Sequence, residues 1–561
     1  MNTDFDVCVI GSGAGGGPVA RTLAEAGYSV VILEKGPWFQ EKDFYKDEIA
    51  AGRRDIYTPD LGEEPHVVEI ENKRGDWEGF STAGSSWNLW NGNMVGGATN
   101  LMSGFFYRLK PMDFRLLSTF GPIAGADIVD WPISYEDLEP YYDKVEREVG
   151  ISGRVVPHPH AEPRSSPDFP YPPTAEHPVS QWIDEACASL GIHALPTPRA
   201  ILPHGALQRR GCSYSGYCGG YGCATGAKGS SRTALIGPAL ATGRCEIRPK
   251  AMVSRLRTDS KGKVIQAEYF NERGQERRVN ARIFVVACHA IETARLLLIS
   301  TGPRHPNGLA NCSGLVGKNL LFAGGGVGSG KLPYSKFDGR KADLLRNFQT
   351  FVNRGIQDWY VIKDPKGGPP QKGGTVDILF RSLGPIARAA RLIHSQEGLV
   401  WGQTLKQRLK SHFEEARYIE IEAFCDWLPV SDCFVRLDPG IKDKWGLPVA
   451  RVRTGFHRHN LSIGWYLAEK GADVLRKLGA EDVFSFVPGS PPTNLVAGTC
   501  RFGNDPERSV LNADCRAHDV ENLYVTDGSF MPTGGSVPYT WTIYANAFRV
   551  ADRIVEQLGA S

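Results

Sequence analysis

Apolar residues along the chain recur with periods that predict alternating strands and helices. Residues 5–10 and 28–33 are apolar runs of strand composition, and the apolar positions 19–23 between them begin a helical face. Residues 282–300 repeat this order of buried strand followed by helix. Residues 253–278 predict strand, turn and strand. This succession predicts an α/β fold.

The pattern changes between residues 321 and 480, which we interpret as a second domain. Strand-like runs at 418–428 and 433–437 alternate there with less periodic segments, and a helix is expected near 460–478. Residues 154–178 are rich in proline and histidine and predict a loop or connection.

Five histidines attract attention before any function is known. Four lie in or near the Pro/His-rich loop, where a metal site and an ordinary surface loop are alternative interpretations: His158, His160, His177 and His193. His289 lies at the predicted strand-to-helix junction within 282–300, and we interpret it as a structural histidine with satisfied hydrogen bonds.

The first strand leads into a glycine pattern that predicts nucleotide binding. Gly11, Gly13 and Gly16 have the G-x-G-x-x-G spacing, and Glu34 ends the second strand. These glycines permit a tight turn, close approach of a pyrophosphate and packing of helix on strand, while the helix N-terminus favours the anion. An acid at the position of Glu34 suits a free ribose 2'-hydroxyl. The motif does not separate FAD from NAD.

Composition narrows the class of protein. The 561 residues are enough for two or more domains, and 64 basic against 62 acidic residues give a net charge of +2, which offers nothing to attract nucleic acid. The chain enters its first strand after four residues and has no run of 18 apolar residues, so we expect no signal peptide and no membrane span. A cytoplasmic location follows, with periplasmic export on a partner's signal left open.

Several motifs together resemble the glucose-methanol-choline (GMC) family of FAD oxidoreductases, and the resemblance covers most of the chain. Beside the N-terminal fingerprint, they read VGGATN, WPISYEDLEPYY, ACHAIETARLLL, GTCRFGNDPERSV and NLYVTDGSFMPT. The likeness is greatest to the sugar-oxidising branch, which includes gluconate 2-dehydrogenase, FAD-glucose dehydrogenase, glucoside 3-dehydrogenase and aminoglycoside dehydrogenases.

The resemblance implies a fold and a cofactor. The expected fold is α/β, with a discontinuous Rossmann-type FAD-binding domain at residues 1–120, 206–320 and 485–561. An α+β substrate domain built on an antiparallel sheet would occupy 121–205 and 321–484. The resemblance places FAD against these residues: Gly11, Gly13, Gly16, Glu34, Gly97, Thr99, Asn100, Val253, Asp527 and Gly528.

Two positions depart from the family pattern. Family members usually carry a catalytic His three residues before the Gly of the G-T-C segment and an Asn or His near the C-terminus, where this chain has Leu495 and Pro538. Neither side chain can accept the proton of an alcohol. The neighbouring Asn494 and Tyr539 are therefore the candidate catalytic residues.

Histidines of the second domain offer another source for the base. His457 and His459 could reach the site from there, and an exposed helix start is the alternative interpretation of both.

Cys212, Cys218 and Cys223 form the one cluster among twelve cysteines. In FAD-glucose dehydrogenase large subunits the corresponding region holds a three-iron four-sulfur cluster, for which three thiolates suffice. Ser215 stands where gluconate-dehydrogenase-like members have another Cys. A loop that keeps its shape without iron is the alternative.

The sequence therefore predicts an FAD-dependent dehydrogenase or oxidase that takes hydride from the CH–OH group of a sugar, glycoside or polyol. Electrons would pass to a small subunit, another electron-accepting partner or a small acceptor. A different flavin reaction and a non-catalytic FAD-binding subunit are the alternatives. Four aromatic residues suit stacking on the substrate: Tyr539, Trp541, Trp87 and Trp90.

Overall fold

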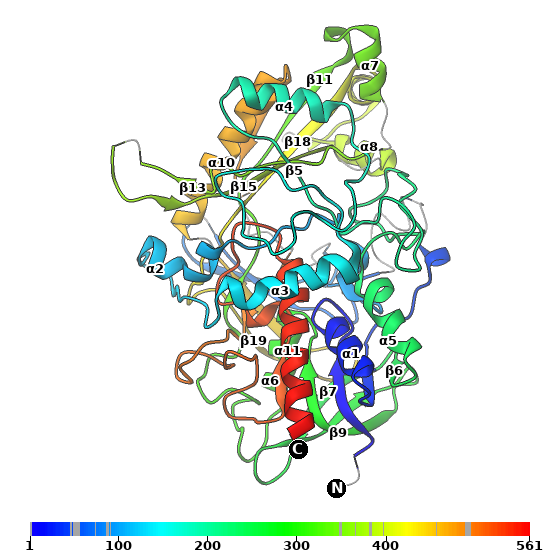
Figure 1. Cartoon of the computed structure of the whole chain (residues 1–561), viewed down its shortest axis with the longest axis vertical. Coiled ribbons are helices and arrows are strands. Elements are labelled where there is room, and N and C mark those ends of the chain that lie inside the picture. The colour runs from blue at the N-terminus through cyan, green and yellow to red at the C-terminus, as the bar shows by residue number, and fades with distance from the viewer. Residues whose placement is uncertain are drawn as a thin grey trace.

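The computed structural model describes most of the chain. The described residues are 3–44, 48, 57–72, 74–85, 89, 91–346, 350–364, 366–380, 384–395, 398–455, 457–488 and 495–560. The molecule is elongated, and both chain ends lie at the same end of its long axis (Figure 1). Within these residues, three large sheets form the framework.

The sheet nearest the chain ends contains the nucleotide-binding pattern. Its strand order is β6-β2-β1-β9-β8-β7, with β23 beside β9. Strands β1, β2, β6, β9 and β23 pair in parallel, whereas β7 and β8 form an antiparallel extension with β9. The bounds are β1 Phe5–Ile10, β2 Val30–Leu33, β6 Cys245–Arg248, β7 Met252–Thr258, β8 Val264–Phe270, β9 Glu276–Val286 and β23 Leu523–Val525.

Helices cover this sheet because the parallel strands carry apolar side chains on both faces. The α1 helix follows the glycine turn and packs against α11, which in turn packs against α3. Ser134 caps α3 by accepting a hydrogen bond from the backbone N–H of Asp137. The bounds are α1 Gly16–Glu25, α3 Tyr135–Val145, α6 Ala290–Ile299 and α11 Thr540–Ala560.

The sheet at the opposite end is antiparallel, with the order β21-β11-β18-β15-β12-β5. Its core face packs against α10 and carries the apolar residues of a separate hydrophobic cluster. The bounds are β5 Leu195–Pro196, β11 Val327–Pro333, β12 Arg354–Ile356, β15 Gly374–Phe380, β18 Ala416–Cys425, β21 Glu481–Phe486, α4 Val179–Ser189 and α10 Arg458–Lys477.

A third sheet has the order β22-β10-β19-β20-β3-β4 and packs against α6. Its bounds are β3 Val67–Glu71, β4 Trp77–Ser81, β10 Lys318–Leu321, β19 Phe434–Lys442, β20 Pro448–Thr454 and β22 Ala497–Thr499. The shorter elements are α2 Leu116–Phe120, α5 Gly237–Ala241, α7 Gly339–Arg346, α8 Pro385–Leu392, α9 Gly402–Lys410, β13 Val361–Ile362, β14 Gln371–Lys372, β16 His394–Ser395 and β17 Gly398–Leu399.

The α/β class predicted from the sequence is confirmed. So are the strand-to-helix units at 5–33 and 282–300 and the helix near 460–478, which is α10. The division at 1–120, 206–320 and 485–561 against 121–205 and 321–484 stays a prediction. Among the described helices, none is both long and apolar enough to span a bilayer.

Candidate active site

A cavity of about 490 Å³ lies where the fingerprint turn, the turn after Val95, the start of α6, the strand β18 and the start of α11 meet. Segments from the whole length of the chain therefore line one space. Of the residues that the resemblance places against FAD, Gly11, Gly13, Glu34, Gly97, Thr99, Val253, Asp527 and Gly528 line it.

The fingerprint glycines fulfil different steric roles. Gly11 has a φ of +93°, and a Cβ there would lie 2.3 Å from the carbonyl oxygen of Ala287. A Cβ on Gly16 would lie 2.0 Å from the carbonyl oxygen of Gly11. A Cβ on Gly13 would meet nothing within 4 Å. Gly11 and Gly16 are thus required by the fold itself, whereas Gly13 leaves room on the cavity side of the turn for a ligand.

Glu34 is held in place by the same turn. Its carboxylate accepts hydrogen bonds from the Ser12 hydroxyl at 2.6 Å, the Ser12 N–H at 3.0 Å and the Gly36 N–H at 2.8 Å. Burial raises the pKa of Glu34 and these hydrogen bonds oppose the rise. A carboxylate offers about four lone-pair positions, so a ribose hydroxyl can still donate to it.

The Gly96–Asn100 turn packs directly against the fingerprint. Gly96 has a φ of +89° and its N–H donates to the Ser12 hydroxyl at 2.8 Å. A Cβ on Gly97 would lie 3.4 Å from the Cα of Gly13. Asn100 lies behind the cavity wall, where its amide donates to the Val95 and Gly97 carbonyls at 2.9 and 3.0 Å. Asn100 therefore stabilises the turn that Gly97 and Thr99 present to the cavity.

His289 is not the satisfied structural histidine that the sequence predicted. Its ring lines the cavity, and within the described part of the chain its buried Nδ1 has no hydrogen-bond partner. Burial lowers the pKa of His289 to about 4, so the ring is neutral at pH 7. The interpretation failed because the junction between β9 and α6 opens onto the cavity instead of packing against protein.

Leu495, Pro538 and Tyr539 also line the cavity. Tyr539 is fully buried, and no partner of its hydroxyl is found among the described residues. Burial and the nearby charge of Asp426 hold the pKa of Tyr539 well above its usual value of 10, so the phenol keeps its proton at neutral pH. Asn494 lies outside the described residues.

Of the aromatic residues expected to stack on the substrate, Tyr539 lines the cavity and Trp541 does not. Trp541 is 1% exposed in the core, and its indole N–H donates to the Tyr142 carbonyl at 3.2 Å. The prediction that Trp541 contacts substrate is wrong, because it lies on the face of α11 that packs against α3. Trp87 and Trp90 lie outside the described residues.

The candidate histidines of the second domain do not line the cavity. His457 is the N-cap of α10, where its Nδ1 accepts from the His459 N–H and its Nε2 lies 2.9 Å from the Ala124 carbonyl. The helix-start interpretation of both residues is therefore confirmed.

A carboxylate that the sequence analysis missed does line the cavity. Glu422 of β18 lies in the cavity wall, as does Phe424 two residues further along the strand. Burial, with the charge of Glu420, raises the pKa of Glu422 to about 7. The strand was predicted, and Glu420 and Glu422 alternate in it with apolar residues, but this alternation does not tell which space the acidic face borders.

The three clustered cysteines surround a second cavity of about 510 Å³, which shares its Glu422 wall with the first. Burial raises the pKa of Cys212 to about 11. Burial acts in the same direction on Cys223, but the charge of Lys228 and hydrogen bonds outweigh it and lower the pKa of Cys223. The structure thus brings the three thiols to one space.

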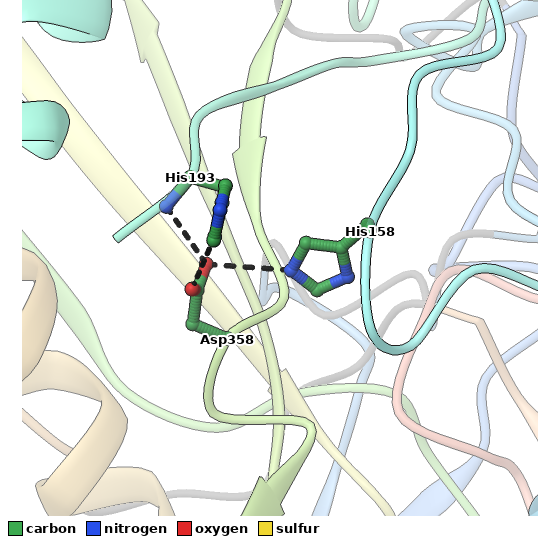
Figure 2. Close-up of side chains that lie close together, drawn as sticks. All are labelled: His158, His193 and Asp358. Carbon is green, nitrogen blue, oxygen red and sulfur yellow. Dashed lines mark hydrogen bonds and ion pairs between the residues drawn. The ribbon is translucent and has the colours of Figure 1, made fainter. Parts of the chain in front are cut away.

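Two histidines of the Pro/His-rich region meet an aspartate (Figure 2). His193 Nδ1 lies 2.8 Å and His158 Nε2 lies 3.5 Å from the Asp358 carboxylate. The His160 N–H donates to His158 Nδ1, which leaves the ring proton on Nε2, facing Asp358. Burial opposes ionisation of Asp358, but the histidines lower its pKa to about 2. This arrangement is a hydrogen-bonded network around the Asp358 carboxylate, since a metal-binding His donates from its other nitrogen.

Comparison with known proteins identifies this architecture. Family models described as GMC oxidoreductase match residues 78–322 and 429–547. The chain is 34% identical to 2-methyl-1,2-propanediol dehydrogenase of Mycolicibacterium austroafricanum, over 98% of the chain and 95% of that protein. It is 31% identical to 6'''-hydroxyparomomycin C oxidase of Streptomyces lividus, over 99% and 92%.

A more distant relative is the fructose dehydrogenase large subunit of Gluconobacter japonicus, with 27% identity over 99% of the chain and 98% of the subunit. Among solved structures, formate oxidase superposes with a TM-score of 0.65 and 16% identity, covering 100% of this chain and 99% of that one. At that identity, the structural likeness establishes the fold.

Proposed function

The chain belongs to the GMC oxidoreductase family, and from this premise we propose that it oxidises a CH–OH group of a polyol, sugar or glycoside with bound FAD. The observation that carries the proposal is the first cavity. Its lining includes both the dinucleotide-binding turn and Leu495, Pro538 and Tyr539. The relatives named for a diol, an aminoglycoside and fructose support this substrate class.

The residues present fit FAD. The open side of Gly13 accommodates a pyrophosphate at the start of α1, and Glu34 can accept from a ribose hydroxyl. The unpartnered Nδ1 of His289 is a polar atom that a ligand in the cavity would satisfy. When bound, FAD supplies the two-electron acceptor for hydride from the substrate carbon.

Protein residues around the reacting end have restricted roles. Leu495 and Pro538 shape the wall and exclude water but exchange no proton. Tyr539 keeps its proton at neutral pH, so it can donate a hydrogen bond to the substrate oxygen and orient the alcohol. It is not the base.

The function is tested by anaerobic mixing of the FAD-loaded protein with 2-methyl-1,2-propanediol, glucose, fructose and a methyl glucoside. Bleaching of the flavin by at least one of them is expected. A flavin that dithionite reduces but that ignores every alcohol would contradict the proposal.

A second experiment asks whether the pocket is that of an ordinary family member. The double variant Leu495→His with Pro538→Asn restores the usual pair and is expected to retain alcohol oxidation, with a pH dependence set by the new histidine. Tyr539→Phe is the matched single variant, because it removes only a hydroxyl. We expect it to raise KM more than it lowers kcat.

We also propose that the cysteine-lined cavity holds an iron–sulfur cluster that passes electrons to a partner subunit. The support is the convergence of Cys212, Cys218 and Cys223 on one space that shares a wall with the first cavity. A relative named as a large subunit is consistent with a partner. Iron and acid-labile sulfide in purified protein, lost in Cys218→Ser but kept in Cys312→Ser, would support it. Flavin absorption without iron would refute it and make the cysteines structural.

A further inference from the structure

The absence of a base at positions 495 and 538 raises the question of where the alcohol proton goes. Strand β18 offers a candidate base, because its side chains alternate between the two faces of the sheet. Ile419, Ile421 and Ala423 are buried in the hydrophobic cluster beneath the sheet, so Glu420, Glu422 and Phe424 point to the opposite face. Glu422 and Phe424 reach the first cavity.

Glu422 stands at the junction of the two cavities. Ser103, Phe105 and Gly219 are the other residues that line both. Within the described part of the chain, the Glu422 carboxylate has no hydrogen-bond or ion-pair partner, although its side chain is only partly exposed. A carboxylate in that setting is available to a ligand that enters the cavity.

A second carboxyl faces it from the neighbouring strand. Asp377 of β15 is directly opposite Glu422 in the antiparallel register, so both side chains lie on one face of the sheet. Asp377 is fully buried. Its Oδ1 accepts from the Tyr107 hydroxyl at 2.5 Å, and its Oδ2 has no partner among the described residues.

Two acids at directly opposed positions of neighbouring strands, one of them fully buried and the other only partly exposed, do not both ionise readily. Burial and the charge of Glu422 raise the pKa of Asp377 to about 7. Burial and the charge of Glu420 likewise raise the pKa of Glu422 to about 7. The pair therefore titrates near neutral pH. Other titratable or charged groups face this pair from the adjoining segments: Tyr107, Arg199, Lys228, the thiols of the second cavity, and Arg417 and Glu420 on β18. On the other side, the neighbour of Glu422 on β11 is the uncharged Val327.

We propose that Glu422, paired with Asp377, is the catalytic base of this enzyme in place of the usual histidine. The Glu422 carboxylate takes the hydroxyl proton as the O–H bond breaks. The oxygen keeps that electron pair and forms the carbonyl, while the C–H pair leaves as hydride to the bound cofactor. Asp377 is a positioning residue, since it acts on Glu422 across the strands and is itself held by Tyr107. The proposal rests on the proposed alcohol oxidation.

The test compares two acids on the same strand. Glu422→Gln, which keeps shape and removes the base, is expected to slow anaerobic flavin reduction by 2-methyl-1,2-propanediol by about 100-fold or more. It should also abolish the rise of the rate as pH increases through about 7. Glu420→Gln removes the neighbouring charge instead, so the rise should persist and move to lower pH. Asp377→Asn should move it in the same direction.

A second readout needs no turnover. Infrared difference spectra of the FAD-bound protein, titrated through neutral pH, should show a protonated-carboxyl band that is lost on raising the pH and is missing in Glu422→Gln.

Three outcomes separate the hypotheses. A Glu422→Gln variant that reduces flavin within about threefold of the wild-type rate, with the same pH profile, would overturn the proposal; the same holds if no band titrates. If no alcohol bleaches the wild-type flavin, the proposed function fails. The infrared band then still decides whether Glu422 titrates in the cavity.

Discussion

Gly13→Ala is expected to weaken FAD binding without destabilising the protein, and Gly16→Ala is expected to do the reverse. The two residues belong to one motif, but a Cβ on Gly13 meets nothing within 4 Å whereas a Cβ on Gly16 would lie 2.0 Å from a backbone oxygen. Gly13 lines the cavity, so the added methyl group would occupy space that a pyrophosphate needs.

The magnitudes follow from what each methyl group displaces. Moving the pyrophosphate away from the turn loses about one hydrogen bond to a charged group, worth roughly 1.5–3 kcal/mol, which raises the Kd for FAD by about 10- to 100-fold. In the cofactor-free protein, Gly13→Ala should be neutral or stabilising by up to about 1 kcal/mol. The Gly16 methyl group forces the backbone apart and should cost about 1–3 kcal/mol or more.

The Kd for FAD and the free energy of unfolding can both be measured on one preparation. The cofactor is removed, FAD is titrated back while flavin fluorescence is followed, and denaturant unfolding of the cofactor-free protein is recorded for each variant. The reasoning would be refuted by a Gly13→Ala protein that binds FAD within twofold of the wild-type Kd. A Gly16→Ala protein as stable as wild type would refute the assignment of Gly16 to the fold.

Three further predictions concern other parts of the molecule. Trp541→Ala should lower the free energy of unfolding by about 3–5 kcal/mol, because it empties a core position. A variant that keeps its stability but loses activity per folded molecule would contradict this placement. In protein prepared without iron, Cys223 should react with a maleimide faster than Cys212 at pH 8, because Lys228 lowers the pKa of Cys223 and burial raises that of Cys212 to about 11. Mass spectrometry of labelled peptides measures the two rates. Three arginines surround Glu69 and, despite its burial, lower its pKa below the usual 4.5. Its stabilisation is therefore present above that value and lost as pH falls, so the difference in unfolding free energy between wild type and Glu69→Gln should shrink on acidification.

Local physics made much of the fold readable from the sequence. The glycine turn and α1, the helix start at Ser134 and the amphipathic α10 each depend on residues close together in the chain. Glycine spacing, capping and apolar periodicity act over a few residues, so they appear in sequence. The same holds for the absence of a base at Leu495 and Pro538, because an aliphatic side chain cannot accept a proton in any fold.

The tertiary structure decided which side chains share a space. Asp377 and Glu422 are distant in sequence, and only the register of β15 with β18 sets them opposite each other. His289 became a cavity residue and Trp541 a core residue through the packing of α6 and α11, which no local pattern reports. A strand's alternation tells which residues share a face, but which face borders the cavity depends on the sheets and helices packed around it.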